Sequence, residues 1–197
     1  TIQAMVLSLS IFSAFDSGIM AAQDAERLWE HSVATSRLSR CIARAQGISG
    51  HALAPYQSAG LLHDLGKLVI ATAEPKTYRG IAAIAAATGA RPWRIENDVL
   101  GCSHAEIGAY LLGIWGLPST IVEAVAWHHH PSDSPVTEFS PLTAVHVASV
   151  FHSQWHPEYK QGDPQLDQEF LERIGLAERQ AEWIQICTEQ LAEGGMK

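Results

Sequence analysis

The chain has few cysteines, and this scarcity limits the kinds of site that it can form. Its 197 residues include only three, Cys41, Cys102 and Cys187, and no two of them form a C-x-x-C pair. Disulfide frameworks and zinc knuckles need even numbers or closely spaced pairs of cysteine, so neither class is indicated. Free thiols of this kind are typical of a reducing compartment, and we therefore expect a cytoplasmic protein.

Long apolar runs and clusters of basic residues are also lacking. The longest apolar stretch, residues 4–15, is interrupted by Ser8, Ser10 and Ser13 and is too short to cross a bilayer. It has neither the basic leader nor the cleavage site of a secretory signal, so we expect no membrane association. Thirteen basic against 21 acidic residues give a formal net charge of −8, and no run of Lys and Arg offers a phosphate-binding face. We therefore expect no nucleic-acid partner.

No strand-like alternation of apolar and polar residues persists, whereas helical spacing recurs along the whole chain. The clearest amphipathic helix is predicted over residues 22–46, with Gly47 as its stop signal. Proline at the first turn and glycine after the last turn delimit several others. Further helices are predicted over residues 3–15, 75–89, 92–101, 106–115 and 118–128. Two more run from Pro55 to the His63-Asp64 turn and from Ser140 through His146 and His152. Two closing helices are predicted near residues 163–164 and over 177–193. The fold class is therefore predicted to be all-α.

Histidines spread over several segments are the strongest indication of a functional site. His63 and Asp64 are adjacent, and Gly66 is expected to let the backbone turn there. An imidazole and a carboxylate can bind one divalent metal ion. Because one helix face presents residues only at three- or four-residue spacing, a complete ligand set must come from several helices. The other candidates are His31, His104, the run from His128 to His130, and His146.

Local position distinguishes these histidines from one another. His31 borders the apolar stripe of its helix and is expected to point inward. His104 lies in a first helical turn, where the helix dipole favours the neutral imidazole that can coordinate a metal. His128 and His129 end a helix. The remaining histidines are interpreted as surface or packing residues (His51, His152, His156) or as a turn residue (His130).

The ordered motifs resemble the HD superfamily of helical metal-dependent phosphohydrolases, and most closely its HDOD branch, the output domains of bacterial signalling proteins. The resemblance is carried by residues 28–32 with His31, 59–68 with His63, Asp64 and Lys67, 96–112 with His104, and 115–131 with the histidine run. It covers residues 1–155, which we expect to form an HD-like helical bundle. Residues 156–197 are expected to form a C-terminal helical appendage. HDOD domains carry a further helical portion upstream, which we expect to be missing from this chain.

The related HD-GYP phosphodiesterases cleave cyclic di-GMP, and the resemblance to them implies specific roles. Metal ligands are implied at His31, His63, Asp64, His104, His128 and His129, and a catalytic lysine at Lys67. Three departures count against catalysis: His146 replaces a late ligand Asp, Arg27 replaces a Glu four residues before the first His, and no Gly-Tyr-Pro follows the histidine run. Loss of a bridging carboxylate disfavours a multinuclear site.

Two interpretations of the site remain. One is a mononuclear site for Fe, Mn, Ni or Zn formed by His31, His63, Asp64 and His146, with His104, His128 and His129 as secondary candidates. The other is a relic in which the same imidazoles form a hydrogen-bonded network without metal.

The preferred functional hypothesis is a bacterial regulatory domain of the HDOD type that relays signals by protein contacts and does not catalyse a reaction. Its expected partners are other signalling proteins or domains, or a second copy of the chain. The alternative is a metal-dependent phosphohydrolase acting on a nucleotide or cyclic dinucleotide, in which Asp64 binds the metal and Lys67 steadies the phosphate. A metal- or redox-responsive sensor and a plain helical scaffold are weaker alternatives, and the scaffold leaves the dispersed histidines unexplained.

Overall fold

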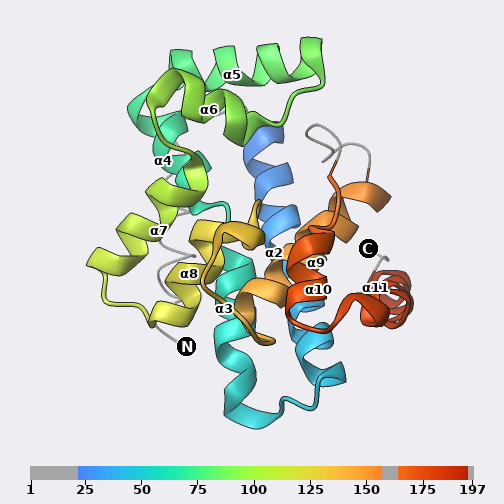
Figure 1. The fold of residues 1–197 in the computed structure, drawn as a ribbon. Helices are drawn as coiled ribbons and strands as arrows, with labels where there is room; N and C mark the ends of the chain where they lie inside the picture. Colours follow the sequence, from blue (N-terminus) through green and yellow to red (C-terminus); the bar gives the residue numbers. More distant parts are fainter. Residues whose placement is uncertain (1–21, 157–163, 195–197) are drawn as a thin grey trace.

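The structure is a computed structural model that describes residues 22–156 and 164–194 (Figure 1). Within these ranges no strand occurs, and the all-α prediction is confirmed. The α-helices are α2 (Ala22–Ala45), α3 (Ala54–Leu62), α4 (Leu65–Ala73), α5 (Pro75–Thr88), α6 (Pro92–Leu100), α7 (His104–Ile114), α8 (Ser119–Trp127), α9 (Pro141–Trp155), α10 (Gln168–Arg173) and α11 (Gln180–Gly194). Short 3₁₀ turns cover Gly50–Leu53 (η1), Pro131–Asp133 (η2) and Ala177–Arg179 (η4).

Helices α2 and α9 run through the middle of the molecule, with α4, α7 and α8 on one side and α10 and α11 on the other (Figure 1). They pack against each other and against α3, and their apolar stripes supply fully buried residues such as Leu38, Ile42 and Val145. This central packing sets the positions from which the polar side chains of the bundle converge.

The C-terminal residues share the same hydrophobic cluster. Phe170 and Leu171 of α10 and Trp183 and Cys187 of α11 are each 0% exposed and belong to one cluster with the helices of the bundle. Residues 164–194, expected to form an appendage, therefore pack onto the core. The boundary near residue 156 stays a prediction, and the predicted helix 3–15 lies outside the described residues.

Several helix ends follow from local signals in the sequence. Ser103 forms a capping box with Glu106: the Ser103 hydroxyl accepts from the Glu106 backbone N–H, and the Glu106 carboxylate accepts from the Ser103 backbone N–H. Gly101 ends α6 in the left-handed region with φ of 77°, where a side chain would be strained. None of the described helices is long and apolar enough to cross a membrane.

Helix α4 was not predicted, and the expected role of Gly66 was wrong. Gly66 does not have a positive φ; it lies inside α4, directly after the His63-Asp64 junction. A Cβ atom at this position would overlap the backbone carbonyl of His104 at the start of α7, and one at Gly108 would lie 3.2 Å from the Gly66 nitrogen. Glycine is therefore needed because α4 and α7 touch backbone to backbone, which brings Asp64 close to His104.

Candidate metal centre

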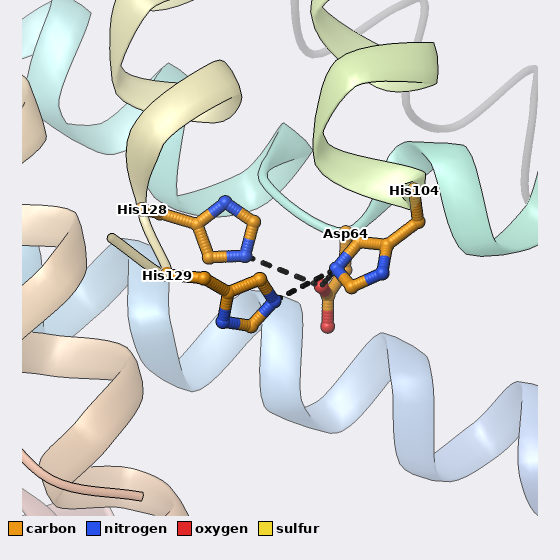
Figure 2. Close-up of side chains that lie close together, drawn as sticks. All are labelled: Asp64, His104, His128 and His129. Carbon is orange, nitrogen blue, oxygen red and sulfur yellow. Dashed lines mark hydrogen bonds and ion pairs between the residues drawn. The ribbon is translucent and has the colours of Figure 1, made fainter. Parts of the chain in front are cut away.

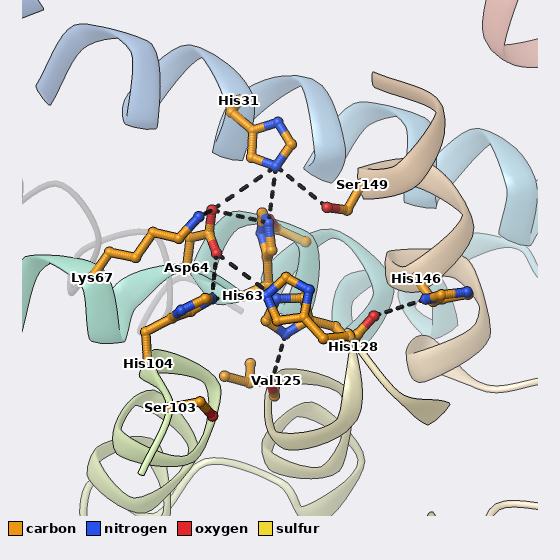
Figure 3. A network of polar contacts seen from close by, with 12 residues as sticks. His31, His63, Asp64, Lys67, Ser103, His104, Val125, His128, His146 and Ser149 are labelled. Atoms are coloured by element: carbon orange, nitrogen blue, oxygen red, sulfur yellow. Dashed lines mark hydrogen bonds and ion pairs between the residues drawn. The ribbon is translucent and has the colours of Figure 1, made fainter. Parts of the chain in front are cut away.

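Asp64 lies at the centre of a buried polar cluster built from several helices (Figure 3). It occupies the junction between α3 and α4, where His63 ends one helix and Asp64 precedes the next. His31 reaches this point from α2 and His104 from the first turn of α7, while His128 and His129 follow α8. His63, Asp64 and His104 are at most 2% exposed, so water hardly reaches them.

Four of these residues form the more complete of two potential ligand groups: Asp64, His104, His128 and His129 (Figure 2). One donor atom of each lies within 4.8 Å of the others. Asp64 Oδ1 lies 3.1 Å from His104 Nε2 and 3.8 Å from His128 Nε2, and His129 Nε2 lies 3.0 Å from His104 Nε2. A divalent metal would take the place of the protons between these facing atoms. We call this set the Oδ1 group.

The outer ring nitrogens of His104 and His128 are held by oxygen acceptors. His128 Nδ1 donates to the carbonyl of Val125 at 2.8 Å, and His104 Nδ1 lies 2.6 Å from Glu96 Oε2. Such contacts fix the ring orientation and turn Nε2 inward, as in ordinary metal sites. His128 Nε2 is buried and makes no hydrogen bond within the described part of the chain. An orphaned, inward-facing nitrogen of this kind fits a metal ligand.

The second group, called here the Oδ2 group, consists of His31, His63 and Asp64. Asp64 Oδ2 lies 3.4 Å from His63 Nε2 and 3.9 Å from His31 Nε2. The same oxygen accepts a hydrogen bond of 2.8 Å from Lys67 Nζ, and the two imidazoles face one another at 3.2 Å. Lys67 therefore already neutralises the side of Asp64 on which a metal would bind.

His146 does not join either group, so the structure does not assemble the expected set of His31, His63, Asp64 and His146. Both of its ring nitrogens are occupied: Nδ1 donates to the backbone carbonyl of His128 at 2.8 Å, and Nε2 accepts from the backbone N–H of Asp167 at 2.9 Å. The residue predicted to replace a ligand Asp instead links backbone segments. Its three expected partners do lie together, and the secondary candidates provide the larger donor set.

Three residues outside the predicted set also contribute. Glu96 is 2% exposed and accepts from both the ring and the backbone N–H of His104. His152, interpreted as a surface or packing residue, is 3% exposed and faces His31 Nδ1 at 2.8 Å. Asp167 caps α10 and bonds His146. Glu96 begins one of the motifs that carry the family resemblance and Asp167 stands at a helix-cap position, whereas nothing local marks His152.

Burial and charge keep the cluster in the form that binds cations. Burial alone would raise the pKa of Asp64, but His63, Lys67 and His104 lower it to well below its usual range. For His128 and His129, burial lowers the pKa, and the neighbouring imidazoles lower it further. At neutral pH these histidines therefore present lone pairs to an ionised carboxylate.

His104 is the exception among the imidazoles of the Oδ1 group. Burial alone would lower its pKa, but the adjacent Glu96 carboxylate reverses the effect, so that the pKa of His104 is raised. A metal bound to Nε2 would compete with that proton, and metal affinity should therefore fall in acid.

A cavity of about 200 Å³ opens onto the cluster. Arg27 and Arg91 line it together with Lys67, and Trp93 forms an aromatic wall by stacking on His129 and His130. Arg27 thus does place a cation beside the site, as its position in the sequence indicated, although its side chain is half exposed and lies 4.0 Å from Asp24.

Comparison with known proteins identifies the family. The family model of the HDOD domain matches residues 1–131. The chain belongs to the HDOD domain family. Among curated proteins, an uncharacterized protein of Treponema pallidum is 29% identical over 137 residues, covering 68% of this HDOD chain and 26% of that protein. Ribonuclease Y of Thermus thermophilus is 31% identical over 120 residues, covering 61% of this chain and 16% of that enzyme.

Solved structures share the HDOD fold. An HDOD domain protein of unknown function from Geobacter sulfurreducens has a TM-score of 0.75 at 22% identity, covering 96% of this chain and 65% of that one. A putative signal transduction protein from Marinobacter aquaeolei has a TM-score of 0.65 at 19% identity, covering 85% and 38%. A putative phosphohydrolase from Shewanella amazonensis has a TM-score of 0.64 at 22% identity, covering 95% and 71%. The HDOD chain thus spans about a quarter or less of the length of these curated relatives and between 38% and 71% of the length of these solved chains.

Proposed function

We propose that this HDOD domain is a regulatory module of signal transduction that holds one divalent metal ion in the Oδ1 group and does not catalyse hydrolysis. The observation that carries the proposal is the asymmetry of Asp64. Its Oδ1 atom lies 3.1 Å from His104 and 3.8 Å from His128, and His129 supplies a further donor atom within 4.8 Å, whereas its Oδ2 atom accepts a hydrogen bond from Lys67. One metal ion fits this arrangement better than two.

The donor chemistry supports a transition metal. Three imidazoles and one carboxylate suit Fe, Mn, Ni or Zn, and the oxygen acceptors on His104 and His128 hold the rings in position. Asp64, His104 and His128 are buried, which would replace water ligands of the metal by protein ligands and strengthen the binding.

The same contacts argue against phosphoester hydrolysis by two metals. Such chemistry uses a second ion to activate the attacking water and to stabilise the leaving oxygen. The Oδ2 group provides three protein donors and is partly neutralised by Lys67, while His146 bonds backbone atoms instead of supplying a ligand. Lys67, which was expected to steady a phosphate, donates a hydrogen bond to Asp64.

The role in signalling rests on family membership and on similarity to a putative signal transduction protein. The matched segment is only 26% of the Treponema protein and 16% of ribonuclease Y, which suits a module that works within larger proteins. We propose that its partners are other signalling proteins or domains, or a second copy of the chain, and that nucleic acid is not among them.

A metal-dependent phosphohydrolase remains the second candidate, because the cavity places Arg27 and Arg91 beside the cluster. These guanidinium groups could bind the phosphate of a nucleotide or cyclic dinucleotide. The names of two similar proteins, ribonuclease Y and a putative phosphohydrolase, favour the same chemistry.

One experiment separates the two candidates. The metal-free chain is loaded with Mn, Fe, Ni or Zn in turn, its bound metal is measured by mass spectrometry, and phosphodiester, phosphomonoester and cyclic dinucleotide substrates are added. We expect one bound ion per chain and no turnover. Metal-dependent turnover that is lost in Asp64→Ala but kept in the exposed control Asp98→Ala would overturn the non-catalytic proposal.

A further inference from the structure

The C-terminal helix α10 is tied to the metal centre through His146. The imidazole of His146 is 1% exposed and lies between two backbone groups, the carbonyl of His128 and the N–H of Asp167. A carbonyl can only accept and a backbone N–H can only donate, so Nδ1 carries the proton and Nε2 is the acceptor. Figure 3 shows the contact between His146 and His128. His146 thus joins Asp167, the cap of α10, to His128, a proposed metal ligand.

A second set of contacts joins α10 to the loop that follows the ligands. The Asp167 carboxylate accepts from the backbone N–H of Ser132 at 3.0 Å and from its hydroxyl at 2.5 Å. The same carboxylate caps α10 by accepting from the N–H of Phe170 at 3.0 Å. The cap of the helix and the position of residue 132 therefore depend on one side chain.

Arg173, at the end of α10, holds the rest of this loop. Its guanidinium donates to four backbone carbonyls, those of Pro131, Ser132, Ser134 and Val136, at 2.6 to 3.3 Å. All four acceptors lie within eight residues of His128 along the chain. Only a planar group with several fixed donors can reach so many carbonyls at once, so lysine would replace Arg173 poorly.

We propose that α10 is a positioning element for the metal centre: through His146, Asp167 and Arg173 it sets the positions of His128 and His129 and thereby the affinity for the metal. This inference rests on the proposed metal site. The buried Phe170 and Leu171 anchor the helix, while its outer residues, among them Glu169, Glu172 and Arg173, are exposed.

The test compares Arg173→Ala with Arg179→Ala in the full chain. Arg179 is the matched control, because it also anchors the C-terminal part, through the carbonyl of Ala45 and the carboxylate of Glu182, but does not touch the histidine loop. Two properties are measured: the ring resonances of His128 and His129 in the metal-free protein by ¹H–¹⁵N NMR, and the affinity and visible spectrum of bound Co²⁺.

We expect Arg173→Ala to shift both ring resonances, to alter the Co²⁺ spectrum and to weaken Co²⁺ binding by about 10- to 100-fold, the usual effect of removing groups that orient ligands. Arg173→Lys should recover part of the affinity, and Arg179→Ala should match the wild type. Unchanged ring resonances and Co²⁺ affinity in Arg173→Ala would overturn the inference.

The outcomes also distinguish this inference from the proposed function. If the wild type binds no Co²⁺ and none of the other ions, the metal site fails, and the ring resonances alone decide whether α10 positions the histidines. If Arg173→Ala does not fold by circular dichroism, Ser132→Ala, which removes one hydrogen bond to Asp167, is tested with the same two measurements. Wild-type values in that variant would then count against the coupling.

Discussion

The two ligand groups share Asp64 but differ in what surrounds its two oxygen atoms. In the Oδ1 group, the oxygen lies 3.1 Å from His104 and 3.8 Å from His128, a donor atom of His129 lies within 4.8 Å, and the hydrogen bond from Lys67 goes to the other oxygen. In the Oδ2 group, two imidazoles face the oxygen, and Lys67 is bonded to it at 2.8 Å. His31 is further engaged with His152 and with the hydroxyl of Ser149 at 3.3 Å. Histidine and aspartate in a family motif therefore do not by themselves make a metal site. Whether a metal can bind also depends on the other side chains that contact the same oxygen and nitrogen atoms.

The largest effect is expected where the two groups meet. Asp64→Ala removes the shared ligand and the charge facing Lys67, so metal binding should be abolished. Breaking a buried ion pair should also lower the free energy of unfolding by about 3–5 kcal/mol. Metal content by mass spectrometry and urea unfolding check both effects. Asp98→Ala, at an exposed position of α6, is the control and should leave both values unchanged.

Single histidine variants compare the groups directly. His128→Ala should weaken metal binding by about 100-fold or more, because removing a ligand costs at least as much as removing a group that orients one. His31→Ala should weaken it by less than about tenfold, because His31 belongs to the Oδ2 group. Isothermal titration of each metal-free variant with Zn²⁺ measures the difference. Equal losses in the two variants would show that both groups bind metal.

The variant Gly66→Ala tests the close backbone contact between α4 and α7, and it leaves every proposed metal ligand in place. The new methyl group would overlap the carbonyl of His104, so the free energy of unfolding should fall by about 1–3 kcal/mol and metal affinity should fall with it. Gly80→Ala is a matched control, since Gly80 is also helical but a Cβ atom there would have nothing within 4 Å. That control should raise stability slightly, by up to about 1 kcal/mol.

Acid should destabilise the metal-free protein. Burial lowers the pKa of His31, His128 and His129 in the folded chain, whereas in the unfolded chain they titrate near 6.5. As the pH falls through 6.5, the unfolded state therefore binds more protons than the folded state, and the free energy of unfolding decreases. The loss is at most about 1.4 kcal/mol per pH unit for each proton.

His104 acts in the opposite direction, because its pKa is raised by Glu96; the stability that it contributes is present in acid and lost as the pH rises through its folded pKa. The pKa is lowered for His63, His130 and His146 as well, so the histidines with a lowered pKa outnumber His104 and the net slope should follow them. Urea unfolding at several pH values gives the slope. His128→Gln should make the slope shallower, and His51→Gln, at an exposed position, should not; a stability that rises in acid would contradict the prediction.

The limits of prediction from the sequence are clearest in α4 and α9. In α4, Leu65, Leu68, Ile70 and Ala71 are all buried, so no polar face marks the helix. In α9, every residue from Pro141 to Ala148 is buried, and periodicity cannot show which side faces the site. His146 was therefore expected to coordinate metal, although its ring nitrogens bond backbone groups.

The sequence by itself determined the all-α fold, most helix ends, the family, and Asp64 with its neighbouring histidines as the place where a site would form. These features depend on contacts within about one helical turn or on short ordered motifs, and such contacts are written in consecutive residues. Only the tertiary structure decided which imidazoles face which oxygen of Asp64, why position 66 must be glycine, and that His146 joins α10 to His128. Those relations depend on how closely distant helices pack, and packing distances are set by the whole core rather than by any local stretch.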